Sequence, residues 1–173
     1  VQIGDAGESD CSIMAGGVDK AACSNAGTSV EILYTTYSPA SGSTAWTVTA
    51  SLTSPSCVTC TFGEQVNLVG DHVTGNILYV SAVNTTSLNG EVYFYRGSWS
   101  QWSNYQILTP LHDGNDFTAD PNQFGAQMDA DPVHGRLLAG ACEACLITNN
   151  TNHGSGAVFM YDTESPSAKK MTQ

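Results

Sequence analysis

Positive charge is scarce in this chain of 173 residues, which has 5 lysines and arginines, 16 aspartates and glutamates and a formal net charge of −11. A protein that follows a nucleic-acid backbone neutralises the phosphates with a dense set of cations. Five cations spread along the chain cannot form such a surface, so the sequence excludes nucleic acid as a partner.

Long apolar runs and helical periodicity are also lacking. No apolar run approaches the ~20 residues that a membrane-spanning helix needs, so we expect no membrane insertion. Short runs rich in Val, Ile, Tyr, Thr and Trp instead alternate with clusters of Gly, Asn, Ser and Pro, which is typical of an all-β protein. The runs that predict strands are Ile32–Tyr34, Trp46–Leu52, Ile77–Val83, Glu91–Tyr95, Tyr105–Leu108, Leu137–Ala141 and Ala157–Tyr161.

Motifs of catalysis are missing as well. The sequence has no G-x-S-x-G, no phosphate-binding loop and no dinucleotide fingerprint, and its four histidines lack metal-ligand spacing. We therefore assign no catalytic residue and expect a protein that is not an enzyme.

Cysteines and glycosylation sequons are what the sequence does contain, and both indicate an oxidising, extracellular location. The sequons begin at Asn84 and Asn149, where we expect N-linked glycans. The stretch 38–56, rich in Ser, Thr and Pro, leaves O-linked sugars open.

The six cysteines are expected to form structural disulfides; they are Cys11, Cys23, Cys57, Cys60, Cys142 and Cys145. Cys11 and Cys23 flank one predicted strand and its loop and are the favoured pair. The two C-x-x-C pairs close locally or cross-link neighbouring units, and the sequence does not decide between these. Their spacing also fits a four-thiolate zinc site, which remains the alternative.

An internal repeat of about 60 residues runs through the chain. Phe62-Gly63 and Phe124-Gly125 each precede an acidic turn, a Gly-x-[IL]-L strand and a Gly-x-Val strand. The N-terminal third fits the same template without the Phe-Gly, with Ile13–Gly17 as its second strand and Ser29–Tyr34 aligned with Gly90–Tyr95. The predicted units are 1–61, which lacks its opening strand, 62–123, and 124–173, which is truncated at its last strand.

At these positions the sequence resembles the FG-GAP repeats that build the β-propeller of integrin α-chains. The resemblance rests on the two Phe-Gly dipeptides, on Leu137-Leu138-Ala139-Gly140-Ala141 and on the Gly-x-Val-[YF]-x-[YF] segments that start at Gly90 and Gly156. It implies an all-β fold of three tandem, four-stranded, blade-like sheets. Closed propellers need about four to eight blades, so three do not close a ring.

The acidic turns of that family often hold calcium, but here they are degraded. The first turn keeps Asp5, Glu8 and Asp10, which leaves calcium open at this one place. We expect no other cofactor.

An open stack of sheets exposes edges and apolar faces that invite pairing with a neighbouring chain. We therefore expect an extracellular, glycosylated structural module that associates head to tail with other copies, forming a surface assembly or filament with a use in adhesion. The alternative is a part of a larger integrin-like propeller that binds a protein or glycan ligand through its loops.

Overall fold

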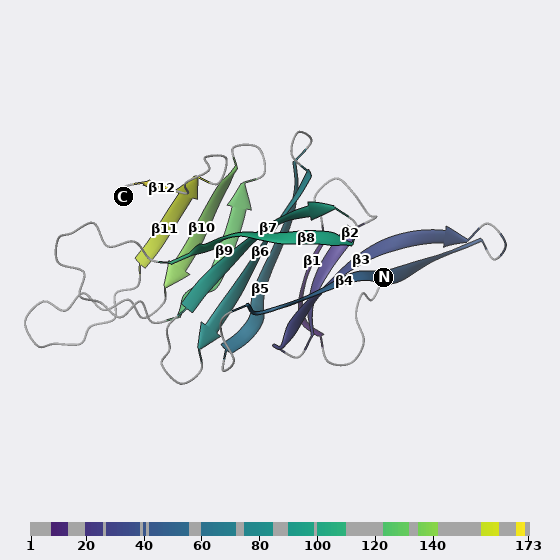
Figure 1. Ribbon diagram of the computed structural model, residues 1–173, viewed down its shortest axis with the longest axis horizontal. Coiled ribbons are helices and arrows are strands. Elements are labelled where there is room, and N and C mark those ends of the chain that lie inside the picture. Colours follow the sequence, from purple (N-terminus) through teal and green to yellow (C-terminus); the bar gives the residue numbers. More distant parts are fainter. Residues whose placement is uncertain are drawn as a thin grey trace, which may run out of the picture.

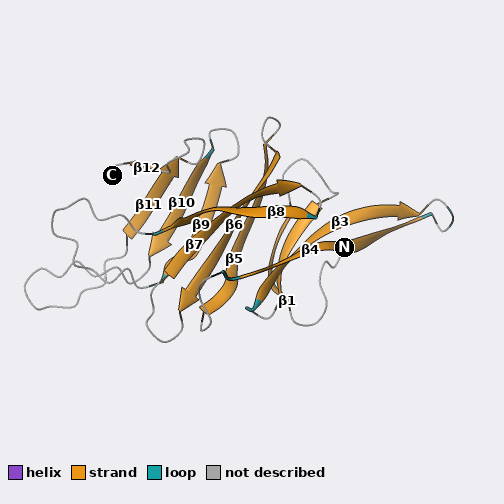
Figure 2. Ribbon diagram, in the orientation of Figure 1, coloured by secondary structure: helices purple, strands orange, loops and turns teal. Residues whose placement is uncertain are grey.

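The described residues form β-strands joined by turns, and no helix occurs among them (Figure 2). The computed structural model describes residues 8–13, 20–25, 27–38, 40, 42–55, 60–71, 75–84, 90–98, 100–109, 123–131, 135–141, 157–162 and 169–171. The prediction of an all-β protein is confirmed. Among the described residues, there is no helix long and apolar enough to cross a membrane.

The strands form three separate four-stranded antiparallel sheets, and each sheet is a meander of consecutive strands. Sheet 1 contains β1 (Glu8–Ile13), β2 (Lys20–Asn25), β3 (Ser29–Ser38) and β4 (Ser43–Thr53). Sheet 2 contains β5 (Cys60–Asp71), β6 (Gly75–Asn84), β7 (Gly90–Ser98) and β8 (Gln101–Leu108). Sheet 3 contains β9 (Phe124–Asp131), β10 (Arg136–Ala141), β11 (Ala157–Asp162) and β12 (Lys169–Met171).

Sheet 1 differs from the prediction. Its opening strand is present, because β1 pairs with β2. The second strand is β2 at Lys20–Asn25, and Ile13, which was predicted to start it, ends β1. The prediction failed because β1 carries no Phe-Gly, and because the small residues of β2 give a weak strand signal.

The three sheets stack in chain order, with sheet 2 in the middle (Figure 1). Strand β5 packs on β1, β2 and β3 of sheet 1, and β9 packs in the same way on β5, β6 and β7 of sheet 2. The first strand of each following sheet therefore lies across the first three strands of the preceding sheet. The stack is open rather than closed into a ring.

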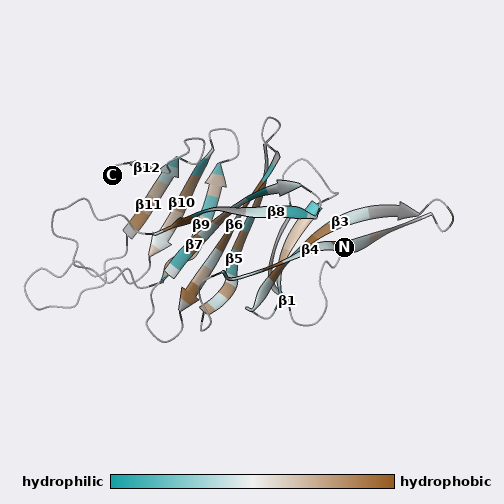
Figure 3. Cartoon of the chain, in the orientation of Figure 1, coloured by the Kyte–Doolittle hydropathy of each residue, from teal (hydrophilic) through white to brown (hydrophobic). Residues whose placement is uncertain are grey.

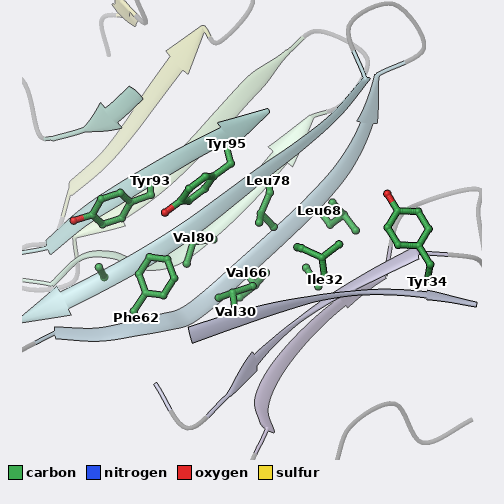
Figure 4. Packing of buried hydrophobic residues seen from close by; sticks show 12 residues of the cluster. Val30, Ile32, Tyr34, Phe62, Val66, Leu68, Leu78, Val80, Tyr93 and Tyr95 are labelled. Atoms are coloured by element: carbon green, nitrogen blue, oxygen red, sulfur yellow. The ribbon is translucent and has the colours of Figure 1, made fainter. Parts of the chain in front are cut away.

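Two hydrophobic cores fill the two gaps between the sheets. The first holds Val30, Ile32, Phe62, Val66, Leu68, Leu78, Val80 and Tyr93, as Figure 4 shows. The second holds Tyr79, Val92, Phe94, Phe124, Leu137 and Tyr161. Successive residues of β6 alternate between the two cores, since side chains along a strand point to opposite faces. A strand buried on both faces has a sequence that is mostly apolar along its length. In Figure 3, β6 accordingly has the brown of hydrophobic residues along much of its length.

Candidate functional site

The Phe-Gly dipeptides lie in two matching β-bulges. In β5, Phe62 pairs with Ala82 but Val66 pairs with Val80, so the strand holds extra residues between these pairs. In β9, the same irregularity follows Phe124, which pairs with Ala141. The glycine of each bulge has a positive φ, 90° at Gly63 and 86° at Gly125. Such a φ favours glycine, because other side chains are strained there.

Each bulge glycine touches a serine and a valine of the preceding sheet. A Cβ atom on Gly63 would lie 2.8 Å from Cγ2 of Val30 and 2.9 Å from Oγ of Ser24. A Cβ atom on Gly125 would lie 2.8 Å from Cγ2 of Val92 and 3.2 Å from Cβ of Ser81.

The two serine–valine pairs are equivalent. Ser24 is opposite Val30 between the second and third strands of sheet 1, and Ser81 is opposite Val92 in sheet 2. The chain therefore uses one stacking contact twice.

The phenylalanine of each dipeptide also makes an equivalent aromatic contact within its own sheet. Phe62 meets Tyr93 edge-to-face with ring centroids 5.6 Å apart, and Phe124 meets Phe159 edge-to-face at 5.5 Å. Tyr93 and Phe159 occupy equivalent places on the third strand of their sheets. The edge-to-face arrangement is the favourable one for aromatic pairs.

The backbones of neighbouring sheets also approach closely. The N–H of Phe62 donates a hydrogen bond of 2.7 Å to the carbonyl oxygen of Gly27. At the second interface, a Cβ atom on Gly90 would clash with the carbonyl oxygen of Phe124. Only glycine at position 90 lets the two strands come this near.

Ser81 also completes the bulge of its own sheet. Its Oγ accepts a hydrogen bond of 2.7 Å from the backbone N–H of Gln65, which lies within the bulge. A bulge interrupts the ladder, so an N–H within it needs another acceptor. The fully buried hydroxyl of Ser81 supplies one.

Sheet 3 has positions equivalent to the serine–valine pairs of sheets 1 and 2, and they lie on its face that points away from sheet 2. Because Phe124–Ala141 corresponds to Phe62–Ala82, the pair Gly140–Val158 corresponds to Ser81–Val92. Leu138 and Met160 form the next pair along the same two strands and share this face. We call these residues the outer face of sheet 3: Leu138, Gly140, Val158 and Met160.

Exposure separates the outer face from the two interfaces inside the stack. Val30 and Val92 are fully buried, whereas Val158 is 61% exposed and Leu138 is 42% exposed. These two residues are among the few large hydrophobic side chains that the described part of the molecule exposes.

The cysteines are only partly covered by the described residues. Cys23 and Cys60 are both disulfide-bonded. Cys11 lies directly opposite Cys23 in the β1–β2 ladder, but its assignment as the partner stays a prediction. Cys57, Cys142 and Cys145 lie outside the described residues.

The sequons and the predicted acidic turn also lie only partly within the described residues. Asn84 ends β6, and Asn149 lies outside the described residues. Asp5 also lies outside them, while Glu8 and Asp10 are in strand β1 and not in a turn. No group of three or more metal-ligand side chains occurs within the described ranges. Glycans at these asparagines and calcium near Glu8 stay predictions.

A buried tyrosine closes the second interface. The hydroxyl of Tyr161 on β11 donates a hydrogen bond of 2.8 Å to the carbonyl oxygen of Thr109, which follows β8. Burial raises the pKa of Tyr161 above its ordinary value of about 10, so the hydroxyl stays protonated and keeps donating in the alkaline range where an exposed tyrosine ionises.

No family model, no curated protein and no solved structure matches this chain. The resemblance to FG-GAP repeats therefore stays a prediction from the sequence.

Sequence reasoning found the two Phe-Gly dipeptides but missed the residues that receive them. The alignment of Ser29 with Gly90 is one residue out of register, since the structure makes Val30 equivalent to Val92. The correct register could have been found from the serines, because Ser24 and Ser81 occupy equivalent places in the strands that precede Val30 and Val92.

Proposed function

We propose that this protein is a non-enzymatic, extracellular structural module that works by stacking its four-stranded sheets into a larger β-assembly. The observation that carries the proposal is the stacking contact itself. The chain uses it twice, at Gly63 and Gly125, and exposes its receiving side a third time at Val158.

The exposed apolar face supports assembly more than catalysis. Contiguous exposed hydrophobic residues mark interaction surfaces in soluble proteins. Leu138 and Val158 lie on the outer face of a regular sheet, and burying both would contribute about 3 kcal/mol at ordinary transfer free energies.

The disulfide-bonded cysteines support the extracellular part of the proposal. Cys23 and Cys60 are both in disulfides, which persist in oxidising compartments. Head-to-tail association of copies, which the sequence led us to expect, would need β1 of one chain to dock on sheet 3 of the next.

The experiment is sedimentation velocity on protein purified from its native source, without reductant or chelator. We expect particles much larger than the 18.2 kDa chain. Val158→Asp should reduce their size, and the matched variant Ile107→Asp, at an exposed residue of β8, should not. Wild-type protein that sediments as a monomer at every concentration would contradict the proposal.

A further inference from the structure

The outer face of sheet 3 is a third copy of a surface that is covered twice within the molecule. The equivalent positions in sheets 1 and 2 are all buried. They are Tyr79, Ser81, Val92 and Phe94 in sheet 2, and Ala22, Ser24, Val30 and Ile32 in sheet 1. What covers them in both cases is the opening strand of the following sheet.

The two covering strands share one pattern of residues. Strand β5 reads Phe-Gly-Glu-Gln-Val-Asn-Leu from Phe62, and β9 reads Phe-Gly-Ala-Gln-Met-Asp-Ala from Phe124. The first, fifth and seventh residues of each segment pack into the core that the strand covers. The pattern is therefore Phe-Gly-x-Gln-apolar-x-apolar, with the apolar residues on the face that meets the preceding sheet.

We propose that the outer face of sheet 3 binds a β-sheet whose opening strand carries this Phe-Gly pattern. The inference rests on the proposed function and names the partner that the assembly requires. The partner is defined by its chemistry: a bulged strand with Phe-Gly, followed by apolar residues at the fifth and seventh positions.

A second folded copy of this chain does not offer such a strand. Its Phe62 and Phe124 are buried in their own interfaces. Its β1 has Glu8 in the register position of Phe62, because Glu8 pairs with Asn25, the neighbour of Ser24. The side of sheet 1 that would have to dock is already covered, since Ala21, Cys23 and Leu33 on that side are buried within the chain.

Charge adds a requirement for the partner. At the interface between sheets 2 and 3, the side-chain amide of Asn67 donates a hydrogen bond of 3.2 Å to the carbonyl oxygen of Met128. The equivalent residue of sheet 3 is Asp129, which is exposed. An ionised carboxylate accepts hydrogen bonds and cannot donate one to a carbonyl. The partner should therefore present a lysine, an arginine or another donor opposite Asp129.

The test uses the full chain extended after Gln173 by a second copy of residues 110–173. In the added copy, Leu138→Thr and Val158→Thr make the end face polar and give its peptides distinct masses. Hydroxyl-radical footprinting then measures the oxidation of Leu138 and Val158 in the original sheet. We expect the oxidation rate of Val158 to fall part of the way toward that of buried Val92, while exposed Ile107 keeps its rate.

Two variants of the extended chain serve as controls. Gly125→Ala in the added copy should restore the oxidation of Val158, because it removes the bulge conformation of the docking strand. Asp129→Asn in the original copy should strengthen the protection, because the added copy carries no cation at this point and an asparagine restores the donor.

Continued oxidation of Val158 in the extended chain, in both the wild-type and the Asp129→Asn background, overturns the inference whether or not the added copy folds. Protection of Val158 in the unextended chain that increases with concentration also overturns it, because a second copy then covers the face; the proposed function would stand. The proposed function is tested separately by sedimentation velocity. It is contradicted if the protein from the native source sediments as a monomer.

Discussion

Three valines in equivalent positions have different surroundings in this molecule. Val30 and Val92 are fully buried beneath the opening strand of the next sheet, while Val158 is 61% exposed at the end of the stack. The register around the three residues is the same, since each is opposite a small residue of the second strand. Burial at this position therefore depends on the neighbouring sheet and not on the sheet that carries the valine.

Substitution of Gly90 should lower the free energy of unfolding the most. Gly90→Ala makes a Cβ atom clash with the Phe124 carbonyl oxygen, so the backbone of β7 or β9 must shift. We expect a loss of about 4 kcal/mol or more in the free energy of unfolding, the size reserved for serious core disruption. Urea titration followed by tryptophan fluorescence measures it.

The matched control is Gly140→Ala on the outer face of sheet 3. A Cβ atom there meets its nearest neighbours at 3.6 Å, an ordinary contact. Its free energy of unfolding should change by no more than about 0.5 kcal/mol. Equal losses in the two variants would show that the close approach of Gly90 to β9 is not a real constraint.

Truncation of the docking phenylalanine comes next in size. Phe124→Ala removes a fully buried ring that contacts Phe159 and Tyr161, and should lower the free energy of unfolding by about 3–5 kcal/mol. Because Phe62 fills the equivalent place at the first interface, Phe62→Ala should cost a similar amount. A negligible cost for either variant would mean that the two interfaces are not equivalent.

The valines themselves provide a more sensitive comparison. Val92→Ala should lower the free energy of unfolding by about 2 kcal/mol, because it deletes two buried methyl groups and leaves a cavity. Val158→Ala should change it by less than about 0.5 kcal/mol in the isolated chain. A loss of equal size at both positions would contradict the exposure of the outer face.

The smallest effect concerns pH. The folded chain keeps Tyr161 protonated above the ordinary pKa of about 10, at which the unfolded chain ionises. The unfolded state therefore binds fewer protons in this range, and the free energy of unfolding should fall as pH rises above about 10.

Tyr161→Phe isolates this contribution. It should cost about 1 kcal/mol at neutral pH, by loss of the hydrogen bond to Thr109, and should make the alkaline decline less steep. Unfolding titrations between neutral and alkaline pH provide the measurement. An unchanged slope would show that Tyr161 is not the titrating group.

Much of the fold follows from residue patterns, and the failures have physical causes. The run Ile77–Val83 predicts β6 because a strand buried on both faces is continuously apolar. The Phe-Gly dipeptides mark β5 and β9 because the bulge needs a glycine of positive φ. The opening strand of sheet 1 was missed because β1 folds without that signal.

The stacking site could be predicted only in part. The sequence shows the strands that dock but not the serine and valine that receive them, because that contact joins two sheets whose packing no local pattern encodes. The outer face of sheet 3 needed the register: Leu137 and Leu138 look alike in sequence, yet the first is fully buried and the second is 42% exposed.

If the stacking contact is used a third time, a further sheet lies on sheet 3 as sheets 2 and 3 lie on sheets 1 and 2. Electron cryo-microscopy of the protein from its native source tests this most directly. We expect a further four-stranded sheet whose bulged Phe-Gly strand covers Leu138 and Val158. An assembly joined through sheet edges, with Leu138 and Val158 in contact with solvent, would contradict it.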